Sequence, residues 1–225
     1  KGFFGPVRLS RLGPVQIESM YADLLDSGLS ATTVHSLHVN LGTCLRAAHR
    51  KGFMSRDVAS LAEAPPARKR KPVILSRLQW KLLLDASASD QTGLIVEFTL
   101  KTGMRIDVEA LNTTWGQIDF DLGEVTVGAS KTIAGEDRVI PLDAALIRRL
   151  KSLRASHSEK QLATKPKRKW NPTDLVFCTS AGNRQSYTNL QRHVLEPLLV
   201  RVGLPHLSWH HLRYNCGSYL LSEKV

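Results

Sequence analysis

The spacing of apolar residues predicts that the first part of the chain is helical. Residues 14–27 begin with Pro14, which is favoured in the first turn of a helix, and end before a glycine. A longer helix is predicted to begin after Ser30, a residue type that caps helix N-termini, and to end near Gly52. Its apolar residues recur three to four positions apart along one face: Val34, Leu37, Leu41, Leu45 and Ala48. A short helix near 55–62 completes a small predicted bundle.

Polar residues of the longer helix fall away from this apolar face: His35, His38, Arg46 and Arg50. They form either a solvated surface or a surface that faces DNA, because imidazole and guanidinium N–H groups are suitable donors to phosphate oxygens. The sequence leaves both interpretations open.

The pattern changes in the second part of the chain and predicts helices mixed with short strands. Ser76 and Gln79 form a capping-box pair that opens a helix through about Ala86. An apolar run predicts a helix over 91–102, which ends at Gly103. The other predicted elements are strands at 117–120, 124–127, 138–140 and 175–178, and helices at 143–154, at 187–202 and from about 208 onward. The predicted fold class is mainly α with a small antiparallel sheet (α+β).

A segment typical of an interdomain linker separates the two patterns. Residues 63–72 carry prolines at both ends of four consecutive cations, Arg68 to Lys71. Proline blocks helix formation there, and like charges extend the chain. We therefore predict a helical domain at 1–64, a basic linker at 65–72 and an α+β domain at 73–225.

Charge gives the first indication of a partner. The chain has 31 Lys and Arg against 20 Asp and Glu, a formal net charge of +11. Such an excess repels itself unless it meets a polyanion, and nucleic acid is the commonest polyanion in cells. A basic protein without a nucleic-acid partner is the alternative. A second basic segment, Thr164–Pro172, is predicted to be a surface loop.

Composition excludes several classes of protein. A chain with 42% hydrophobic and 23% charged residues is neither collagen-like, coiled-coil nor wholly disordered. Its three cysteines show no C-x-x-C spacing, which argues against a disulfide framework or a Cys-rich zinc site and indicates a reducing compartment. No apolar run approaches the roughly 18 residues of a membrane span. The chain begins with Lys rather than Met, so we expect it to be part of a longer one.

The first residue with candidate chemistry is Arg105. It follows Gly103, a glycine that is predicted to end a helix, and rigid backbone on both sides would hold it. Such an arginine can direct its planar guanidinium at one oxyanion. An ion pair with Asp107 or Glu109 at the start of a helix is equally consistent with the sequence.

The second candidate is Lys131, in the segment between two predicted strands. A lysine on a hairpin can reach outward as a mobile cation. Close to a phosphodiester, it could protonate a departing oxygen if nearby positive charge lowered its pKa. An exposed hairpin lysine that only aids solubility is the alternative.

The third candidate is the pair His210 and Arg213, three positions apart on one face of the last predicted helix. A guanidinium can neutralise nonbridging phosphate oxygens, while an imidazole exchanges a proton near neutral pH. A pair on a helix surface without a ligand is the alternative. His211 points elsewhere on this helix and is predicted to be a packing or groove residue.

Taken in order, these segments resemble the tyrosine recombinases, the phage-integrase family. The motifs are T-G-M-R at 102–105, W-x-x-I-D-F at 115–120, S-K-T at 130–132 before R-V-I-P-L at 138–142, and H-x-L-R at 210–213. The resemblance covers nearly the whole chain, with a helical core-binding domain first and a catalytic domain from about residue 73. It implies that Arg105 and Arg213 bind the scissile phosphate, that Lys131 is the general acid on the 5′-oxygen, and that His210 assists proton transfer from the nucleophile.

The resemblance also implies a substrate and an assembly. Members cut and rejoin double-stranded DNA at specific sites through a 3′-phosphotyrosine intermediate, without a metal or other cofactor, and four protomers assemble on the DNA. We therefore expect a DNA-binding recombinase or integrase of a phage or mobile element in the bacterial cytoplasm. For these residues alone a monomer is expected. The alternatives are a DNA-binding protein that does not cut, such as a decayed integrase or site competitor, and an enzyme like the type IB topoisomerases.

Three departures from the family pattern affect the catalytic prediction. The chain ends 12 residues after Arg213 (225 minus 213), before the position expected for the nucleophilic tyrosine, so the catalytic domain is expected to be truncated. Tyr214 is the only tempting substitute, and it is disfavoured because it lies beside an arginine rather than across the phosphate. In addition, Tyr214-Asn215 stands where relatives usually have His-Thr.

The third departure concerns the carboxylate that relatives usually carry three positions after the first arginine. Here that position is Val108, and the glutamate is Glu109. One extra residue rotates an α-helix by about 100°. We therefore expect Glu109 not to support the site as the family glutamate does, and Asp107 to be a substitute.

Overall fold

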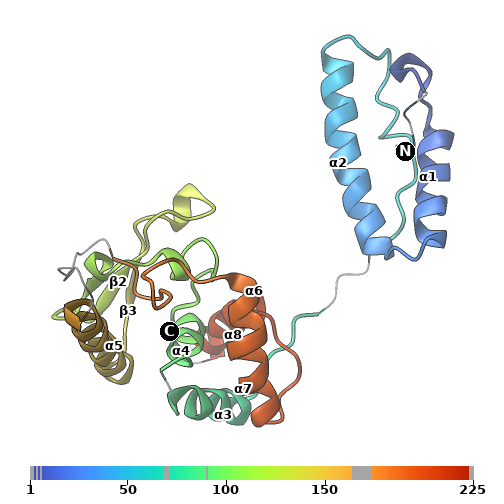
Figure 1. Cartoon of the computed structure of the whole chain (residues 1–225). Helices are drawn as coiled ribbons and strands as arrows, with labels where there is room; N and C mark the ends of the chain where they lie inside the picture. The colour runs from blue at the N-terminus through green and yellow to red at the C-terminus, as the bar shows by residue number, and fades with distance from the viewer. Residues whose placement is uncertain are drawn as a thin grey trace. The chain divides into compact units, whose positions relative to one another are not determined.

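A computed structural model describes residues 3, 5, 7–67, 71–89, 91–163 and 174–222 of the chain. The chain divides into two compact units, residues 1–71 and 72–225, and each is described by itself (Figure 1). The predicted basic loop at 164–172 and residues 68–70 of the predicted linker lie outside the described residues. Within the described part, no helix combines the length and apolar character needed to cross a bilayer.

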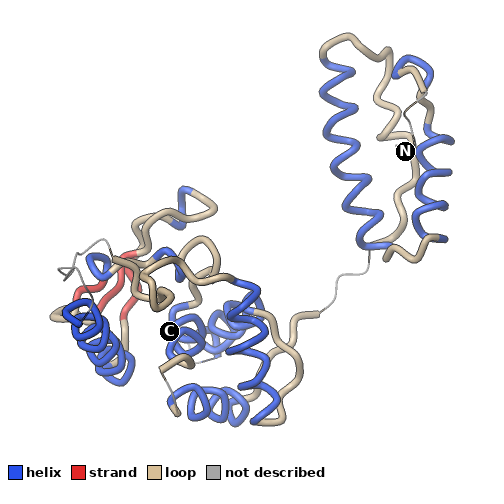
Figure 2. Tube along the Cα trace, viewed as in Figure 1, coloured by secondary structure: helices blue, strands red, loops and turns tan. Residues whose placement is uncertain are grey.

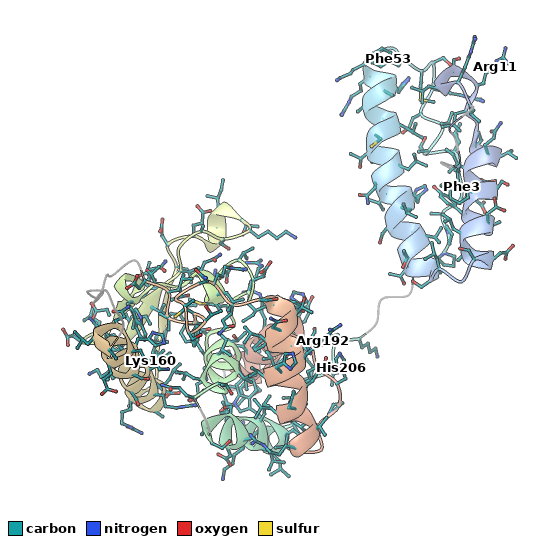
Figure 3. All side chains as sticks on the ribbon, in the orientation of Figure 1. Phe3, Arg11, Phe53, Lys160, Arg192 and His206 are labelled. Atoms are coloured by element: carbon teal, nitrogen blue, oxygen red, sulfur yellow. The ribbon has the colours of Figure 1, made fainter. Side chains whose placement is uncertain are left out.

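The first unit is built on two helices, α1 (Pro14–Asp26) and α2 (Ala31–Arg50), as the apolar spacing predicts (Figure 1). Ser30 caps α2 by accepting a hydrogen bond from the backbone N–H of Thr33 at 3.2 Å. Leu37, predicted on the apolar face, is 40% exposed. Phe53, which follows α2 (Figure 3), is 66% exposed. The buried side chains form a core of their own: Leu12, Ile17, Met20, Tyr21, Val34, Leu45, Met54, Val58, Ala59 and Ala62.

The short helix predicted at 55–62 is wrong, because this segment forms turns and bends. The carboxylate of Asp57 accepts hydrogen bonds from the backbone N–H groups of Ala59 at 3.2 Å and Ser60 at 3.4 Å. Such side-chain bonds offer the backbone an alternative to helical pairing.

The two histidines among the four polar residues of α2 have partners outside this helix. The Nδ1 atom of His38 lies 2.8 Å from the hydroxyl of Tyr21, and that of His35 lies 3.0 Å from the backbone oxygen of Pro65. Both rings are half-buried, so they are not simply part of a solvated or DNA-facing surface. Arg46 and Arg50 are exposed, as both interpretations of this helix require.

The second unit is mainly helical, and α4 (Leu94–Thr102) is its central helix. This helix is buried along most of its length and ends at Gly103 in the left-handed conformation (φ 62°). It packs against α3, α5 and α8 (Figure 1). The other helices are α3 (Arg77–Ala88), α5 (Ala144–Ala163), α6 (Tyr187–Leu190), α7 (Glu196–Arg201) and α8 (Trp209–Ser222).

A small antiparallel sheet lies beside these helices, with its strands in the order β1-β2-β3 (Figure 2). The strands are β1 (Ile118–Asp119), β2 (Glu124–Thr126) and β3 (Val139–Pro141); the first two are shorter than predicted, and the third begins and ends one residue later. The fold class is therefore the predicted α+β class. The predicted strand at 175–178 is wrong, because this segment makes only isolated bridges, Thr114 with Leu175 and Cys178 with Arg184.

Two helical predictions need smaller corrections. Helix α5 continues well past its predicted end at residue 154. The helix predicted at 187–202 contains a π-helical stretch, Gln191–Leu195, between α6 and α7. The hydrophobic pattern predicted both helices, but it did not indicate the π-helical stretch or the additional length of α5.

A buried amide fixes α8 to the segment that precedes α3. Asn215 is 1% exposed. Its Oδ1 atom accepts a hydrogen bond from the backbone N–H of Leu75 at 2.6 Å, and its Nδ2 atom donates to the backbone oxygens of Val73 at 2.9 Å and His211 at 2.8 Å. Asn215, the second residue of the Tyr214-Asn215 pair, thus has a structural role.

We expect Asn215→Ala to lower the free energy of unfolding of the second unit by about 2–3 kcal/mol, because it leaves buried backbone groups without partners. Urea unfolding followed by tryptophan fluorescence measures this, since all four tryptophans lie after residue 72. The control is Asn189→Ala, at an exposed asparagine of α6, which should cost much less. Equal losses in the two variants would contradict the assigned role.

Candidate functional site

One buried carboxylate, that of Glu109, gathers three arginines from distant parts of the second unit. Its side chain is 0% exposed. Its Oε1 atom accepts from Nη1 of Arg105 at 2.7 Å and from the Ser130 hydroxyl at 2.6 Å. Its Oε2 atom accepts from Nη2 of Arg138 at 2.6 Å and lies 3.8 Å from Nη1 of Arg213. We call these five residues the Glu109 cluster.

The prediction that the extra residue turns Glu109 away from the site is wrong. Residues 106–109 form turns rather than an α-helix. The backbone N–H of Ala110 bonds to the oxygen of Arg105, and that of Leu111 to the oxygen of Ile106, both at 3.0 Å and both across five residues. This wider turn absorbs the additional residue, so that Glu109 also accepts from the backbone N–H of Arg105 at 2.8 Å.

Asp107, the predicted substitute, is exposed and lies outside the cluster. Its carboxylate pairs with Arg184 at 2.6 Å. The sequence could not show which of the two carboxylates reaches Arg105, because their orientation depends on the geometry of this turn and not on the periodicity of an α-helix.

The two predicted phosphate-binding arginines are brought together where α4 meets α8. Arg105 follows the left-handed Gly103, and Nη1 of Arg213 donates to the backbone oxygen of Gly103 at 2.5 Å. A Cβ atom at Gly103 would lie 3.1 Å from Sγ of Cys216, so glycine suits both the conformation and the close packing of the two helices.

Each of these guanidinium groups is anchored by one nitrogen. Among the described residues, the hydrogen bonds and ion pairs of Arg105 and Arg213 side chains all involve Nη1. The two side chains are 27% and 33% exposed, so their other N–H groups remain accessible. A guanidinium held on one side and open on the other can donate two hydrogen bonds to one oxyanion.

The electrostatics of the cluster favour an anion. Burial alone would raise the pKa of Glu109, but hydrogen bonds from Arg138, Ser130 and Arg105 outweigh it and hold the pKa at about 2. Burial lowers the pKa of Arg213, and the neighbouring Arg105 lowers it further, while Glu109 opposes the effect. Three arginines and one glutamate leave two net positive charges (3 − 1), which an oxyanion would neutralise.

Lys131 and His210 lie outside the contacts of the cluster. Lys131 is exposed and forms no hydrogen bond or ion pair with a described residue, although it directly follows Ser130. His210 is exposed on α8, and its ring lies edge-on to that of Tyr214 with 4.7 Å between the ring centroids. The structure therefore joins Arg105 and Arg213 through the Glu109 carboxylate, and it relates Lys131 and His210 to them only through adjoining backbone.

A cleft of about 440 Å³ runs alongside the cluster. Arg138 and Arg213 line it together with Gly103, Tyr214 and Gly217. The cationic groups thus border a space that is open to a ligand.

A sequence profile of the Phage integrase family matches residues 75–225. This chain belongs to the phage integrase family. The match covers the whole Glu109 cluster and all four motifs on which the resemblance was drawn.

Comparison with individual proteins supports the same membership. The chain is 24% identical over 247 residues to a tyrosine recombinase XerC-like protein of Caldanaerobacter subterraneus subsp. tengcongensis, and the match covers 97% of this chain and 63% of that protein. The fold of this chain resembles that of the Tn1549 transposon integrase, solved with circular intermediate DNA (TM-score 0.75, 15% identity, 96% of this chain and 74% of the other). It also resembles a lambda integrase dimer solved on a COC′ core site (TM-score 0.68, 18% identity, 96% and 76%).

Three residues of the second unit make contacts that were not predicted. Ser130 and Arg138 lie within recognised motifs, but only the folded chain shows that both reach Glu109. His211, predicted to be a packing or groove residue, accepts a hydrogen bond at Nδ1 from the backbone N–H of Ser208 at 3.0 Å, and this contact caps the N-terminus of α8.

We expect Glu109→Gln to lower the free energy of unfolding at pH 7 by about 3 kcal/mol, because it leaves clustered arginines without their counter-charge. The folded-state pKa of Glu109 is about 2 against an ordinary 4.5. Its stabilisation is therefore complete above about pH 4.5 and is lost as the pH falls towards 2. Urea unfolding across this range should be less pH-dependent in the variant. Glu136→Gln, at an exposed glutamate, is the control, and an equal effect there would contradict the assignment.

Proposed function

We propose that this chain is the DNA-binding and phosphate-activating part of a site-specific DNA recombinase that cuts and rejoins strands through a 3′-phosphotyrosine intermediate. One observation carries the proposal. Arg105 and Arg213, 108 positions apart (213 minus 105), are anchored on the same buried carboxylate with their free N–H groups accessible. Two such groups suit the nonbridging oxygens of a phosphodiester, whose negative charge increases during attack.

The chemistry follows from the types of side chain. The arginines bind the nonbridging oxygens and stabilise the five-coordinate phosphorus. Lys131 gives a proton to the departing 5′-oxygen, and His210, three positions before Arg213 on α8, takes part in removing the proton of the nucleophile. The energy of the broken bond is kept in the ester, so that rejoining needs no nucleotide cofactor.

We propose double-stranded DNA as the partner. The net charge of +11 supports this, and the Tn1549 and lambda integrases were both solved on DNA. Residues 1–64 would bind the core of the DNA recombination site, residues 65–72 would link the two domains, and residues 73–225 would carry the catalytic groups. The lambda integrase was solved as a dimer on its site, which supports assembly on DNA, with a tetramer during recombination and a monomer for these residues alone.

We further propose that the attacking tyrosine is none of the four in these residues. Tyr21 belongs to the first unit, Tyr187 opens α6 and Tyr219 stacks on an indole ring. Tyr214 directly follows Arg213 on α8 and is 49% exposed. In-line attack requires a nucleophile opposite the leaving group, whereas Tyr214 lies beside a residue that would bind the nonbridging oxygens.

This placement of the tyrosines also favours a second candidate function, a DNA-binding protein that occupies sites without cutting them. Strand cleavage separates the two functions. Relaxation of a plasmid without a cognate site would instead indicate chemistry like that of the type IB topoisomerases.

The first test is the salt dependence of DNA binding by the 225-residue chain. For about six neutralised phosphates, the logarithm of the binding constant should fall against the logarithm of salt concentration with a slope of about −5. Fluorescence anisotropy with a labelled duplex measures it. Binding that does not respond to salt would rule out a phosphate-dominated interface.

The second test is strand cleavage by a protein that contains these residues and the attacking tyrosine. Arg105→Ala and Arg213→Ala should each slow cleavage by at least about 100-fold, because each removes donors to the developing oxyanion, while duplex binding is largely kept. Arg201→Ala removes an equal charge from an arginine that is bonded to Ala86 and Ser89, and it should cleave normally. Full activity in both cluster variants would overturn the assignment of the pocket.

A further inference from the structure

The loop that carries Lys131 leaves β2 and returns to β3. Its base is closed by two backbone bonds of 2.9 Å, from the N–H of Val127 to the oxygen of Arg138 and from the N–H of Asp137 to the oxygen of Val127. Asp137 has a positive φ of 55°, which an aspartate tolerates better than most residues. The loop is therefore well defined at its base.

The middle of the loop has little support from the rest of the protein. Ile133 is 90% exposed. Lys131 itself is exposed, and a free lysine side chain populates many rotamers. A lysine that must meet one oxygen of a bound phosphodiester needs its backbone held in place.

A ring of contacts across the loop supplies this restraint. On one side, the hydroxyl of Ser130 donates to Oε1 of Glu109 at 2.6 Å. On the other side, Arg138 donates from Nη2 to Oε2 of Glu109 at 2.6 Å and from Nη1 to the backbone oxygen of Gly135 at 2.7 Å. A Cβ atom at Gly135 would lie 2.4 Å from Oγ of Ser130, so the two sides of the loop approach closely at this point.

The same carboxylate anchors the phosphate-binding arginines. Oε1 of Glu109 is shared by Ser130 and Arg105, and Oε2 is shared by Arg138 and the backbone N–H of Arg105. A movement of the loop relative to Arg105 would therefore break hydrogen bonds to a buried charge, which is costly.

We propose that Ser130 and Arg138 are positioning residues for Lys131. They act through Glu109, which fixes the lysine loop and the phosphate-binding arginines to one another. The proposal rests on the proposed function, because it assumes that Lys131 protonates the 5′-oxygen.

The step that depends on this positioning is departure of the 5′-oxygen. The tyrosine hydroxyl gives up its proton with the help of His210, and its oxygen forms a bond to phosphorus, while the bond from phosphorus to the 5′-oxygen breaks with its electron pair on oxygen. The ammonium group of Lys131 gives that oxygen a proton and becomes a neutral amine. In this scheme Arg138 acts through Glu109 and the backbone of Gly135, the groups to which its hydrogen bonds are made.

The first measurement uses the 225-residue chain and needs no cleavage. Ser130→Ala and Arg138→Lys should speed amide hydrogen exchange at residues 128–137 by about tenfold, because each removes a charge-assisted bond that holds the loop. The matched controls are Thr132→Ala, at the exposed residue on the other side of Lys131, and Arg184→Lys, at the exposed ion pair with Asp107. Unchanged exchange in both test variants would overturn the proposal.

The second measurement compares cleavage of an ordinary strand with one that carries sulfur in place of the bridging 5′-oxygen, using a protein that includes the attacking tyrosine. A thiolate is far less basic than an alkoxide and leaves without a proton donor. Lys131→Ala, Ser130→Ala and Arg138→Lys should therefore be slow on the oxygen substrate and recover at least about tenfold on the sulfur substrate relative to the unsubstituted protein. Arg105→Ala should stay slow on both.

The outcomes distinguish this proposal from the proposed function. Recovery of Lys131→Ala without recovery of Ser130→Ala and Arg138→Lys would overturn the positioning role and leave the recombinase function intact. Failure of the unsubstituted protein to cleave either strand would overturn the recombinase function and the proposal that rests on it, while the exchange data would still show whether Glu109 holds the loop.

Discussion

The arrangement of the second unit depends on the burial of one negative charge. A carboxylate that is fully removed from water is costly unless hydrogen bonds and opposite charges compensate it, and Glu109 obtains both from four side chains. Loss of any partner leaves the charge undercompensated. The carboxylate therefore constrains the turn after α4, the loop after β2, the start of β3 and helix α8 to one relative placement.

The same compensation leaves an excess of positive charge at the surface. The cluster contains more guanidinium groups than one carboxylate can neutralise, and burial and mutual repulsion lower the pKa of Arg213. Hydrogen bonds and ion pairs with Glu109 already hold the guanidinium groups on one side. Little side-chain conformational entropy is therefore lost when an oxyanion binds on their accessible side. The contacts that compensate the buried carboxylate are thus the same ones that hold the guanidinium groups of the proposed phosphate site.

Much of the fold could be predicted because its signals are local. Ser30 and Ser76 cap helices as their positions indicate, and the left-handed Gly103 ends α4. The failures share a different physical origin. The turn at Asp57 and the partners of His35 and His38 depend on particular side-chain bonds, and in two cases these reach segments distant in sequence.

The candidate site was predictable only in part for the same reason. Arg105 and Arg213 could be named from their motifs, and the structure brings them together, but the direction of Glu109 depends on a turn that no helical period describes. The reach of Arg138 across the loop is likewise a tertiary property.

The wide turn between Arg105 and Glu109 has a consequence for how such proteins are compared. An additional residue between an arginine and its carboxylate need not separate their charges, because a widened turn such as that between Arg105 and Glu109 can accommodate it. A search that demands a fixed interval would discard this chain, although its charge constellation is intact. Contact between the charged groups in the folded chain is therefore a better criterion for such a comparison than their separation in sequence.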